Sequence, residues 1–389
     1  MSFDFDREIS RDGTASVKHD GRAAYFGTRD VLPLWVADMD FAAPEAVIRA
    51  LSERAAHPVY GYTFYPDGLF LALISWLKKR HQWEVEREWI LMAPGVVPSL
   101  HAAVMAFAQP GEGVIVQPPV YFPFFSAVTS TGRRLILNPL HLENGRYTID
   151  FPHLERCAAD GARLLLLCSP HNPVGRVWSR GELEEILRIA RRYNLVILSD
   201  EIHADLVYPG QRHTTLATLS NDADNLVTAV APSKTFNIPG MGLSSLIVPN
   251  PAHRTELGKV FDSLHIGHSN PFSIAAFEAA YRGGEAWLDS LLDYLQDTRN
   301  FVAAYLAEHL PAIRLIQSEG TYLLWLDCRG LSMNDAQLGD FFVHMAGVGM
   351  SPGTIFGEQG SGFMRLNIGT PRKVIAAALE RIVHALNAR

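Results

Sequence analysis

Residues 226–240 read Leu-Val-Thr-Ala-Val-Ala-Pro-Ser-Lys-Thr-Phe-Asn-Ile-Pro-Gly, an apolar run that gives way to a polar loop around Lys234. The run 226–230 is typical of a strand covered on both faces. Only six of the 34 basic residues in this chain are lysine, so arginine is its usual surface cation. A lysine at the end of a buried strand can lose its proton and act as an amine nucleophile, whereas an arginine cannot. Taken alone, Lys234 is also compatible with an ordinary surface lysine in a loop.

Similar apolar runs recur through the middle of the chain. The predicted strands are 114–117, 164–168, 195–199, 226–230 and 244–248. Helical patterns lie between them, as in 179–193, where Ser179 and Glu182 resemble a capping box. This alternation predicts βαβ units and therefore an α/β fold with a mostly parallel, doubly wound sheet.

The pattern changes after about residue 275, which suggests a second, smaller α+β domain. Its predicted elements are a helix over 285–310, a strand over 322–327 and helices over 333–346 and 371–388. A chain of 389 residues is long enough for about two to three domains. We expect an N-terminal arm and part of the small domain in 1–45, the large domain in 46–280 and the small C-terminal domain in 281–389.

Composition excludes several classes of protein. A net charge of −7 leaves no basic stripe for nucleic acid, and 48% apolar with 19% charged residues is ordinary for a globular domain. The three cysteines are too few and too widely spaced for a disulfide framework or a CxxC metal pair, which favours a reducing cytoplasm. The first residues lack the apolar core of a signal peptide, and no apolar run approaches the roughly 18 residues of a membrane helix.

Polar residues follow four of the predicted strands: Tyr121, Asn172, Asp200 and Lys234. Ligands of an open parallel sheet bind beyond the carboxyl ends of its strands, so these side chains should converge on one crevice. Each has a simpler explanation when taken singly. Tyr121 suits any loop, Asn172 before a proline suits a turn, and Asp200 could cap a helix. Four such residues at consecutive strand ends favour a common ligand.

A possible phosphate site precedes the predicted helix that runs to Phe107. The segment 94–99 reads Pro-Gly-Val-Val-Pro-Ser, and a glycine at a helix start exposes free backbone N–H groups to an anion. The chain contains neither a Walker A sequence nor a GxGxxG fingerprint, which argues against NTP or NAD as the ligand.

Seven segments together carry a family resemblance: 32–41 (LPLWVADMDF), 60–63 (YGYT), 119–121 (PVY), 169–175 (SPHNPVG), 199–205 (SDEIHAD), 233–240 (SKTFNIPG) and 365–371 (RLNIGTP). In this order they resemble the fold-type I pyridoxal-phosphate (PLP) enzymes of the class I/II aminotransferase superfamily. The similarity is strongest to the MalY/PatB group of cystathionine β-lyases and C–S lyases. It implies an aspartate-aminotransferase-like fold, with PLP bound by the large domain.

The resemblance implies a role for each of the main polar residues. Lys234 matches the Schiff-base lysine, and Asp200 matches the carboxylate that pairs with the pyridinium nitrogen. Asn172 matches the hydrogen-bond donor to the ring phenolate oxygen and also lies near the substrate. Tyr121 matches the aromatic residue stacked on the ring. Arg365 matches the clamp on the substrate α-carboxylate, a task that suits a planar guanidinium. The expected catalytic residues are Lys234, Tyr121 and Asp200.

Further residues are implied around these. Gly95, Val96 and Val97 match the helix start that faces the phosphate, helped by Ser233. Ala37 matches a substrate contact. Tyr62 matches a tyrosine that is lent across the interface of a homodimer, where it contacts both cofactor and substrate.

Two positions depart from the common aminotransferase pattern. Gly242 stands about eight residues after Lys234, where many aminotransferases have a phosphate-binding arginine. His203 stands three residues after Asp200, where many have a tyrosine. Both changes resemble the lyase subgroup, and His203 is expected to lie at the cofactor.

The expected reaction is β-elimination from L-cystathionine or a related cysteine S-conjugate, which gives a thiol, pyruvate and ammonia. PLP acts as the electron sink, and Lys234 is the expected general base at Cα. The alternative is an amino-acid aminotransferase, which would use the same residues. A regulatory protein that binds a partner is the third hypothesis, and the complete catalytic set speaks against it.

Overall fold

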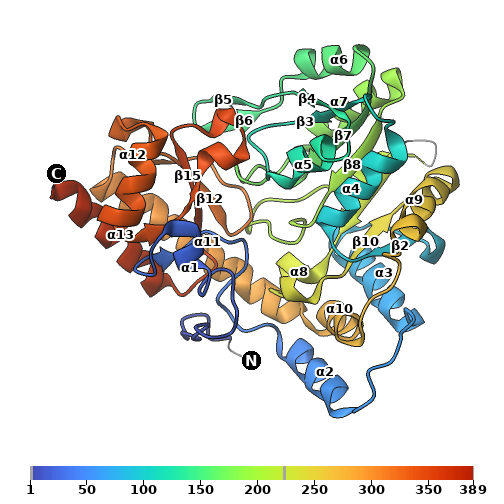
Figure 1. The fold of residues 1–389 in the computed structure, drawn as a ribbon, viewed down its shortest axis with the longest axis horizontal. Coiled ribbons are helices and arrows are strands. Elements are labelled where there is room, and N and C mark those ends of the chain that lie inside the picture. Colours follow the sequence, from blue (N-terminus) through green and yellow to red (C-terminus); the bar gives the residue numbers. More distant parts are fainter. Residues whose placement is uncertain (1–2, 222–224, 389) are drawn as a thin grey trace.

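Two β-sheets organise the chain, as the ribbon of the computed structural model shows (Figure 1). The structure describes residues 3–221 and 225–388. The larger sheet has seven strands in the order β2-β10-β9-β8-β7-β3-β4, and the smaller one has four in the order β11-β12-β15-β14. Helices cover both faces of the larger sheet, and the C-terminal helices pack around the smaller one (Figure 1). The predicted α/β fold with a second, smaller α+β part is confirmed.

The larger sheet contains all five strands predicted in the middle of the chain. Its members are β2 (Ile90–Ala93), β3 (Gly113–Val116), β4 (Arg134–Leu137), β7 (Ala162–Cys168), β8 (Val196–Asp200), β9 (Leu226–Val230) and β10 (Ser244–Ile247). All neighbouring pairs are parallel except those of β10, which runs antiparallel to β2 and β9. The sequence did not predict β4, because this edge strand is partly exposed and begins with an arginine. An edge strand lacks the continuous apolar run of a central strand.

The side chains of the central strands divide between two hydrophobic clusters. Leu164 and Leu166 of β7 belong to a cluster with α4 (Val96–Phe107), whereas Leu165 and Leu167 belong to a cluster with α7 (Arg180–Tyr193). Successive residues of a strand point to opposite faces, so β7 is covered from both sides. α5 (Pro123–Thr129) and α9 (Pro251–Leu264) share the first face, and α6 (Phe151–Ala159) shares the second. The predicted capping box of α7 is confirmed, with Ser179 and Glu182 reciprocally bonded.

The smaller sheet is antiparallel throughout and lies beside long helices. It is formed by β11 (Arg314–Leu315), β12 (Leu323–Asp327), β14 (Ser351–Pro352) and β15 (Phe363–Asn367). α11 (Glu285–His309) and α13 (Arg372–Asn387) agree with two predicted helices. The helix predicted over 333–346 is confirmed, but it is slightly shorter and not α-helical throughout. Asn334 caps α12 (Asp335–Asp340), so the helix begins later, and it continues as a π-helical turn over Phe341–Met345.

The N-terminal segment lies against the smaller sheet region. It contains the short helix α1 (Arg22–Phe26), which sequence periodicity did not reveal, and β1 (Leu32–Pro33), which pairs in parallel with β13 (Val348–Gly349). The chain then enters α2 (Glu45–Ala56) and α3 (Asp67–His81), both of which pack against α10 (Pro271–Gly283). Within the described ranges, no helix combines the length and apolar character that crossing a membrane requires.

Candidate active site

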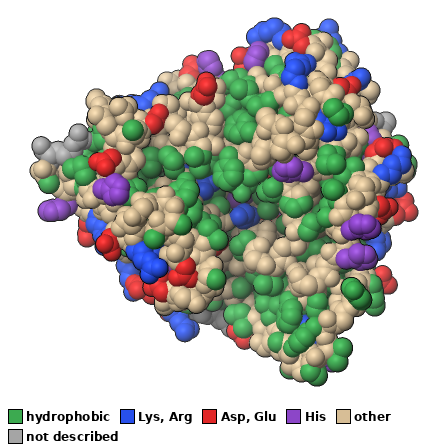
Figure 2. Space-filling model, in the orientation of Figure 1, with side chains coloured by type: hydrophobic (Ala, Val, Ile, Leu, Met, Phe, Trp, Pro, Cys, Tyr) green, Lys and Arg blue, Asp and Glu red, His purple; other side chains and the backbone are tan. Residues whose placement is uncertain are grey.

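A cavity of about 290 Å³ lies at the carboxyl ends of β3, β7, β8 and β9. Figure 2 shows the centre of this face hollowed, with basic side chains set deep among hydrophobic ones. The cavity lining includes most of the residues predicted from the sequence: Ala37, Gly95, Val96, Val97, Tyr121, Asn172, Asp200, His203, Ser233 and Lys234. The structure therefore brings the four polar strand ends together at one place, as the parallel order of these strands requires.

Lys234 lies in α8 (Pro232–Thr235), the single helical turn that follows β9. Its Nζ donates a hydrogen bond of 2.6 Å to the carbonyl oxygen of Ala37. Burial, together with the positive charge of Arg365, lowers the pKa of Lys234 to about 8, against the opposing pull of Asp38 and Asp200. Lys234 thus gives up its proton more readily than an ordinary lysine, as a nucleophile or a base needs.

Asp200 is the last residue of β8 and is almost fully buried. One carboxylate oxygen accepts a hydrogen bond of 3.1 Å from the backbone N–H of Ile202. Burial is the main cause that raises the pKa of Asp200 to about 7. A cation placed beside a buried carboxyl group lowers that pKa again and is itself stabilised. Asp200 therefore provides a place for a positively charged ring nitrogen.

Arg365 reaches the site from β15 of the smaller sheet. It is only 4% exposed, and its Nη1 donates to Asn172 Oδ1 at 3.1 Å while its Nη2 donates to the carbonyl oxygen of Trp35 at 2.8 Å. The Nε–H of Arg365 is buried and has no hydrogen-bond partner. Burial lowers the pKa of this guanidinium to about 10. An unpaired donor on a buried cation is costly, and a carboxylate would satisfy it.

The start of α4 forms the other end of the cavity. Gly95 precedes the helix, and Val96 and Val97 occupy its first turn, where backbone N–H groups lack helical partners. Ser233 lines the cavity beside them. Gly242, the first departure from the family pattern, also lines it and has a φ of +50°, in the left-handed region that favours glycine. An arginine would be strained at this position, and a phosphate bound here would need donors from other residues.

His203, the second departure, lies in the cavity wall with its Nδ1 buried and unpartnered. Burial, and then the charges of Lys234 and Arg365, lower the pKa of this imidazole to about 3. The ring is therefore neutral at physiological pH. Its ring centroid lies 6.2 Å from that of Tyr322.

Several neighbours of the site were not predicted. Tyr322, just before β12, donates from its hydroxyl to the carbonyl oxygen of Ala37 at 2.9 Å, so this oxygen also serves Lys234. Cys168 lines the cavity at the end of β7. Neither belongs to a sequence motif, and only their position in the fold identifies them. Tyr62 lies outside the cavity and is fully exposed, with a relative exposure of 110%.

These groups fit PLP. Lys234 provides the reactive amine, and Asp200 provides a carboxylate for the ring nitrogen. The start of α4 and Ser233 provide donors for a phosphate, and Tyr121 provides an aromatic wall. The unpartnered Nδ1 of His203 is one further polar group that a bound cofactor could satisfy.

Sequence comparison places the chain among known enzymes. The family model described as "Aminotransferase class I and II" matches residues 29–382. The chain is 43% identical to cystathionine β-lyase PatB of Bacillus subtilis, over 98% of this chain and 100% of PatB. It is 32% identical to the protein MalY of Escherichia coli, over 99% of each chain.

Solved structures agree with this placement. Cystalysin from Treponema denticola, whose crystal structure contains pyridoxal 5′-phosphate, matches with a TM-score of 0.97 at 38% identity, over 100% of both chains. The PLP-bound C–S lyase from Staphylococcus hominis matches with a TM-score of 0.92 at 33% identity, over 99% of this chain and 98% of that one. The chain belongs to the class I and II aminotransferase family, in the group that includes PatB and MalY.

Proposed function

We propose that this protein is a PLP-dependent carbon–sulfur β-lyase that cleaves L-cystathionine or related cysteine S-conjugates to a thiol, pyruvate and ammonia. The observation that carries this proposal is the cavity in which Lys234, Asp200, Asn172 and Tyr121 meet, with Arg365 beside it. The choice between β-elimination and transamination rests on the similarity to named relatives. Identity is 43% to a named cystathionine β-lyase, and 25% to the aspartate aminotransferase of Pyrococcus horikoshii.

PLP, when bound, supplies the electron sink that stabilises negative charge at the substrate Cα. Arg365 binds the substrate α-carboxylate through its free Nε–H and orients the amino acid. Lys234 takes the Cα proton onto Nζ, and the carbonyl oxygen of Ala37 accepts one of its N–H groups, which orients the amine. Asp200 holds a proton on the ring nitrogen. The sulfur then leaves as a thiolate, for which the proton on Lys234 is available.

Tyr121 and Asn172 complete the proposed cofactor contacts. Tyr121 lines the cavity as the stacking ring, and Asn172 lies next to it, because the Tyr121 N–H donates to the Asn172 carbonyl oxygen at 3.1 Å. Gly95, Val96, Val97 and Ser233 would bind the phosphate. His203 would contact the cofactor as a neutral ring, in keeping with its lowered pKa.

An aminotransferase would use the same residues, so the experiment must follow the fate of the substrate. The purified protein, loaded with PLP, is incubated with L-cystathionine in the absence of any keto acid. A lyase releases pyruvate and a thiol in equal amounts over many turnovers. Release of pyruvate only after a keto acid is added, or no release at all, would refute the lyase assignment.

We further propose that the protein acts as a homodimer in which Tyr62 contributes to the neighbouring site. The linker between α2 and α3 supports this, because it exposes a run of large apolar side chains: Val59, Tyr60, Tyr62 and Phe64. Contiguous exposed apolar surface is characteristic of an interface. A cytoplasmic location, with a role in sulfur amino-acid metabolism, is also part of the proposal. It is supported by three cysteines that are all free and buried.

The domain boundaries expected from the sequence belong to the proposal as well. α10 packs on α2 and α3 beside the larger sheet, and α11, beginning at Glu285, packs on β11 and α13 of the smaller part. This arrangement supports a boundary near residue 280. The pairing of β1 with β13 supports an N-terminal arm, within 1–45, that completes the small domain.

A further inference from the structure

Residues 35–40, which we call the strap, present the carbonyl groups of two alternate residues to the polar residues of the site. The carbonyl oxygen of Trp35 accepts from Arg365 Nη2 at 2.8 Å. The carbonyl oxygen of Ala37 accepts from Lys234 Nζ at 2.6 Å and from the Tyr322 hydroxyl at 2.9 Å. The two basic residues of the proposed reaction are thus both held by the strap. Their positions depend on where its backbone lies.

Two asparagines fix the same stretch of backbone. Asn367 Nδ2 donates to the carbonyl oxygens of Val36 and Asp38 at 2.6 and 2.7 Å. Asn237 accepts from the N–H of Met39 at 2.9 Å and donates to its carbonyl oxygen at 2.9 Å. The strap is therefore a short irregular segment that lies in no sheet. Its carbonyl groups are bound mainly by side chains, and the N–H groups of Asp38 and Asp40 donate to the carbonyl oxygens of Val36 and Gly369.

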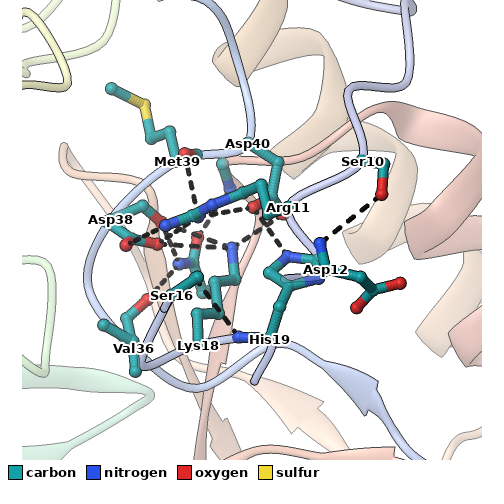
Figure 3. Close-up of polar contacts among 12 residues, drawn as sticks. Ser10, Arg11, Asp12, Ser16, Lys18, His19, Val36, Asp38, Met39 and Asp40 are labelled. Carbon is teal, nitrogen blue, oxygen red and sulfur yellow. Dashed lines mark hydrogen bonds and ion pairs between the residues drawn. The ribbon is translucent and has the colours of Figure 1, made fainter. Parts of the chain in front are cut away.

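The side chains of the strap meet a cluster of charges from the N-terminal segment (Figure 3). Arg11 binds both oxygens of Asp38, at 2.9 and 2.7 Å, and one oxygen of Asp40 at 2.8 Å. Lys18 Nζ lies 2.8 Å from the other oxygen of Asp40 and donates to the carbonyl oxygen of Asp38 at 3.3 Å. The carbonyl oxygen of Lys18 in turn accepts from the indole N–H of Trp35 at 3.0 Å.

Burial makes this cluster a strong constraint. The side chain of Lys18, one of only six lysines in this chain, has an exposure of 0%. Burial alone would raise the pKa of Asp40, but Lys18, His19 and Arg11 hold it well below its usual range. Loss of one partner would leave a buried charge unpaired, and the strap would have to move to rehydrate it.

We propose that Arg11 and Lys18 are positioning residues for the reaction: through Asp38 and Asp40 they hold the strap, and through its carbonyl groups they set the positions of Lys234 and Arg365. The cluster also affects the electrostatic potential at the Lys234 amine and therefore its pKa. The charged groups that act on this amine are Arg365, Asp38 and Asp200, and the titratable rings beside it are His203 and Tyr322. Arg11 neutralises Asp38 and thereby weakens its pull on the Lys234 proton.

The test uses the full chain in two measurements. The first is the rate at which PLP-free protein captures PLP, followed by absorbance as a function of pH, which reports the proton on Lys234 without any amino-acid substrate. The second is kcat and KM for pyruvate release. The variants are Arg11→Gln, Asp38→Asn and Lys18→Met. The matched control is Lys373→Met, which removes another ion pair of the N-terminal segment, that of exposed Lys373 with Glu8 at 2.6 Å.

Opposite shifts are expected from the two charges. Arg11→Gln leaves the charge of Asp38 less neutralised and should raise the pH at which the rate of PLP capture is half maximal. Asp38→Asn removes this negative charge and should lower the same midpoint pH. Each shift should be about half a pH unit to one pH unit. Lys18→Met lets the strap move and should lower kcat about tenfold to a hundredfold. Lys373→Met should keep the kcat and the midpoint pH of the wild type.

Shifts in the same direction, or none, would overturn the inference, as would a Lys18→Met enzyme that melts earlier but keeps the kcat of the control. If Lys18→Met does not fold, the two milder variants still decide the question. The inference rests on the proposed function, because it assigns Lys234 the reaction with PLP. A wild-type protein that captures PLP but releases no pyruvate would refute the lyase activity alone, and the capture midpoints would still test the positioning role.

Discussion

Replacing Arg365 by lysine should cost this enzyme its grip on the substrate carboxylate while leaving its cofactor in place. Of the five N–H groups of the guanidinium, one on Nη1 donates to Asn172 and the two on Nη2 donate to Trp35 and Ser351, whereas the buried Nε–H has no partner. A lysine keeps the positive charge but has one compact ammonium group. It cannot hold Asn172 and Trp35 and still present a donor in the plane of a carboxylate.

The structure sets the size of the expected effect. A hydrogen bond between charged groups contributes about 1.5–3 kcal/mol, and Arg365→Lys removes about one such bond to the substrate. At about 1.36 kcal/mol for each factor of ten, kcat/KM should fall by roughly 10- to 150-fold. Most of the loss should appear in KM if the contact is equally strong in the ground state and the transition state.

The assay compares an L-cysteine S-conjugate with its methyl ester, which has lost the negative charge. Pyruvate formed from the acid, or its methyl ester formed from the other substrate, is quantified in the wild type and in Arg365→Lys. The wild type should prefer the acid, and the variant should lose most of this preference. The absorbance of bound PLP should be retained. An equal loss on both substrates would show that Arg365 acts through the fold and not through the carboxylate, and the reasoning would be refuted.

Two further predictions concern the dimer and the pH dependence of stability. Lys234→Ala should abolish both the absorbance of lysine-bound PLP and pyruvate release. Mixing it with inactive Tyr62→Ala should restore about a quarter of wild-type activity, because half of the dimers then carry one intact site; no recovery after proven subunit exchange would argue against a shared site. The His81–Asp205 pair (2.8 Å) raises the pKa of His81 in spite of burial. The contribution of this pair to the free energy of unfolding is complete below about pH 6.5, the pKa of His81 in the unfolded chain. It is lost as the pH rises through the higher pKa of His81 in the folded protein. The melting temperature should therefore fall above this pH, and His81→Gln should flatten that fall; parallel curves for the two proteins would contradict it.

Local patterns in the sequence were sufficient to locate the central strands of the larger sheet. Continuous apolar runs mark the central strands because both of their faces are buried, and β9 begins and ends where its run does. The capping box of α7 was readable for the same reason, since both partners lie within one turn of helix. Edge strand β4 gave a weaker pattern. No pattern in the sequence indicated that β10 is antiparallel to its neighbours, because an apolar run looks the same in a parallel and in an antiparallel strand.

The polar strand ends show how far the sequence determined the site. Tyr121, Asn172, Asp200 and Lys234 could be assembled from the sequence because the parallel sheet brings its carboxyl ends to one edge. Arg365 was identified through family resemblance, and its contact with Asn172 spans 193 positions of sequence. Ala37, which was expected to contact the substrate, lines the cavity, and its carbonyl group binds Lys234 and Tyr322, which the sequence did not indicate.

The sequence by itself determined the fold class and the polar strand ends, including the place of Lys234, because these follow from periodicity and from the order of motifs. The tertiary structure alone decided which groups surround that lysine. The bond from Lys234 to Ala37 joins residues 197 positions apart, and the cluster of Arg11 and Lys18 with Asp38 and Asp40 joins segments with no shared pattern. Such contacts depend on how the chain folds back on itself, and burial then makes them strong.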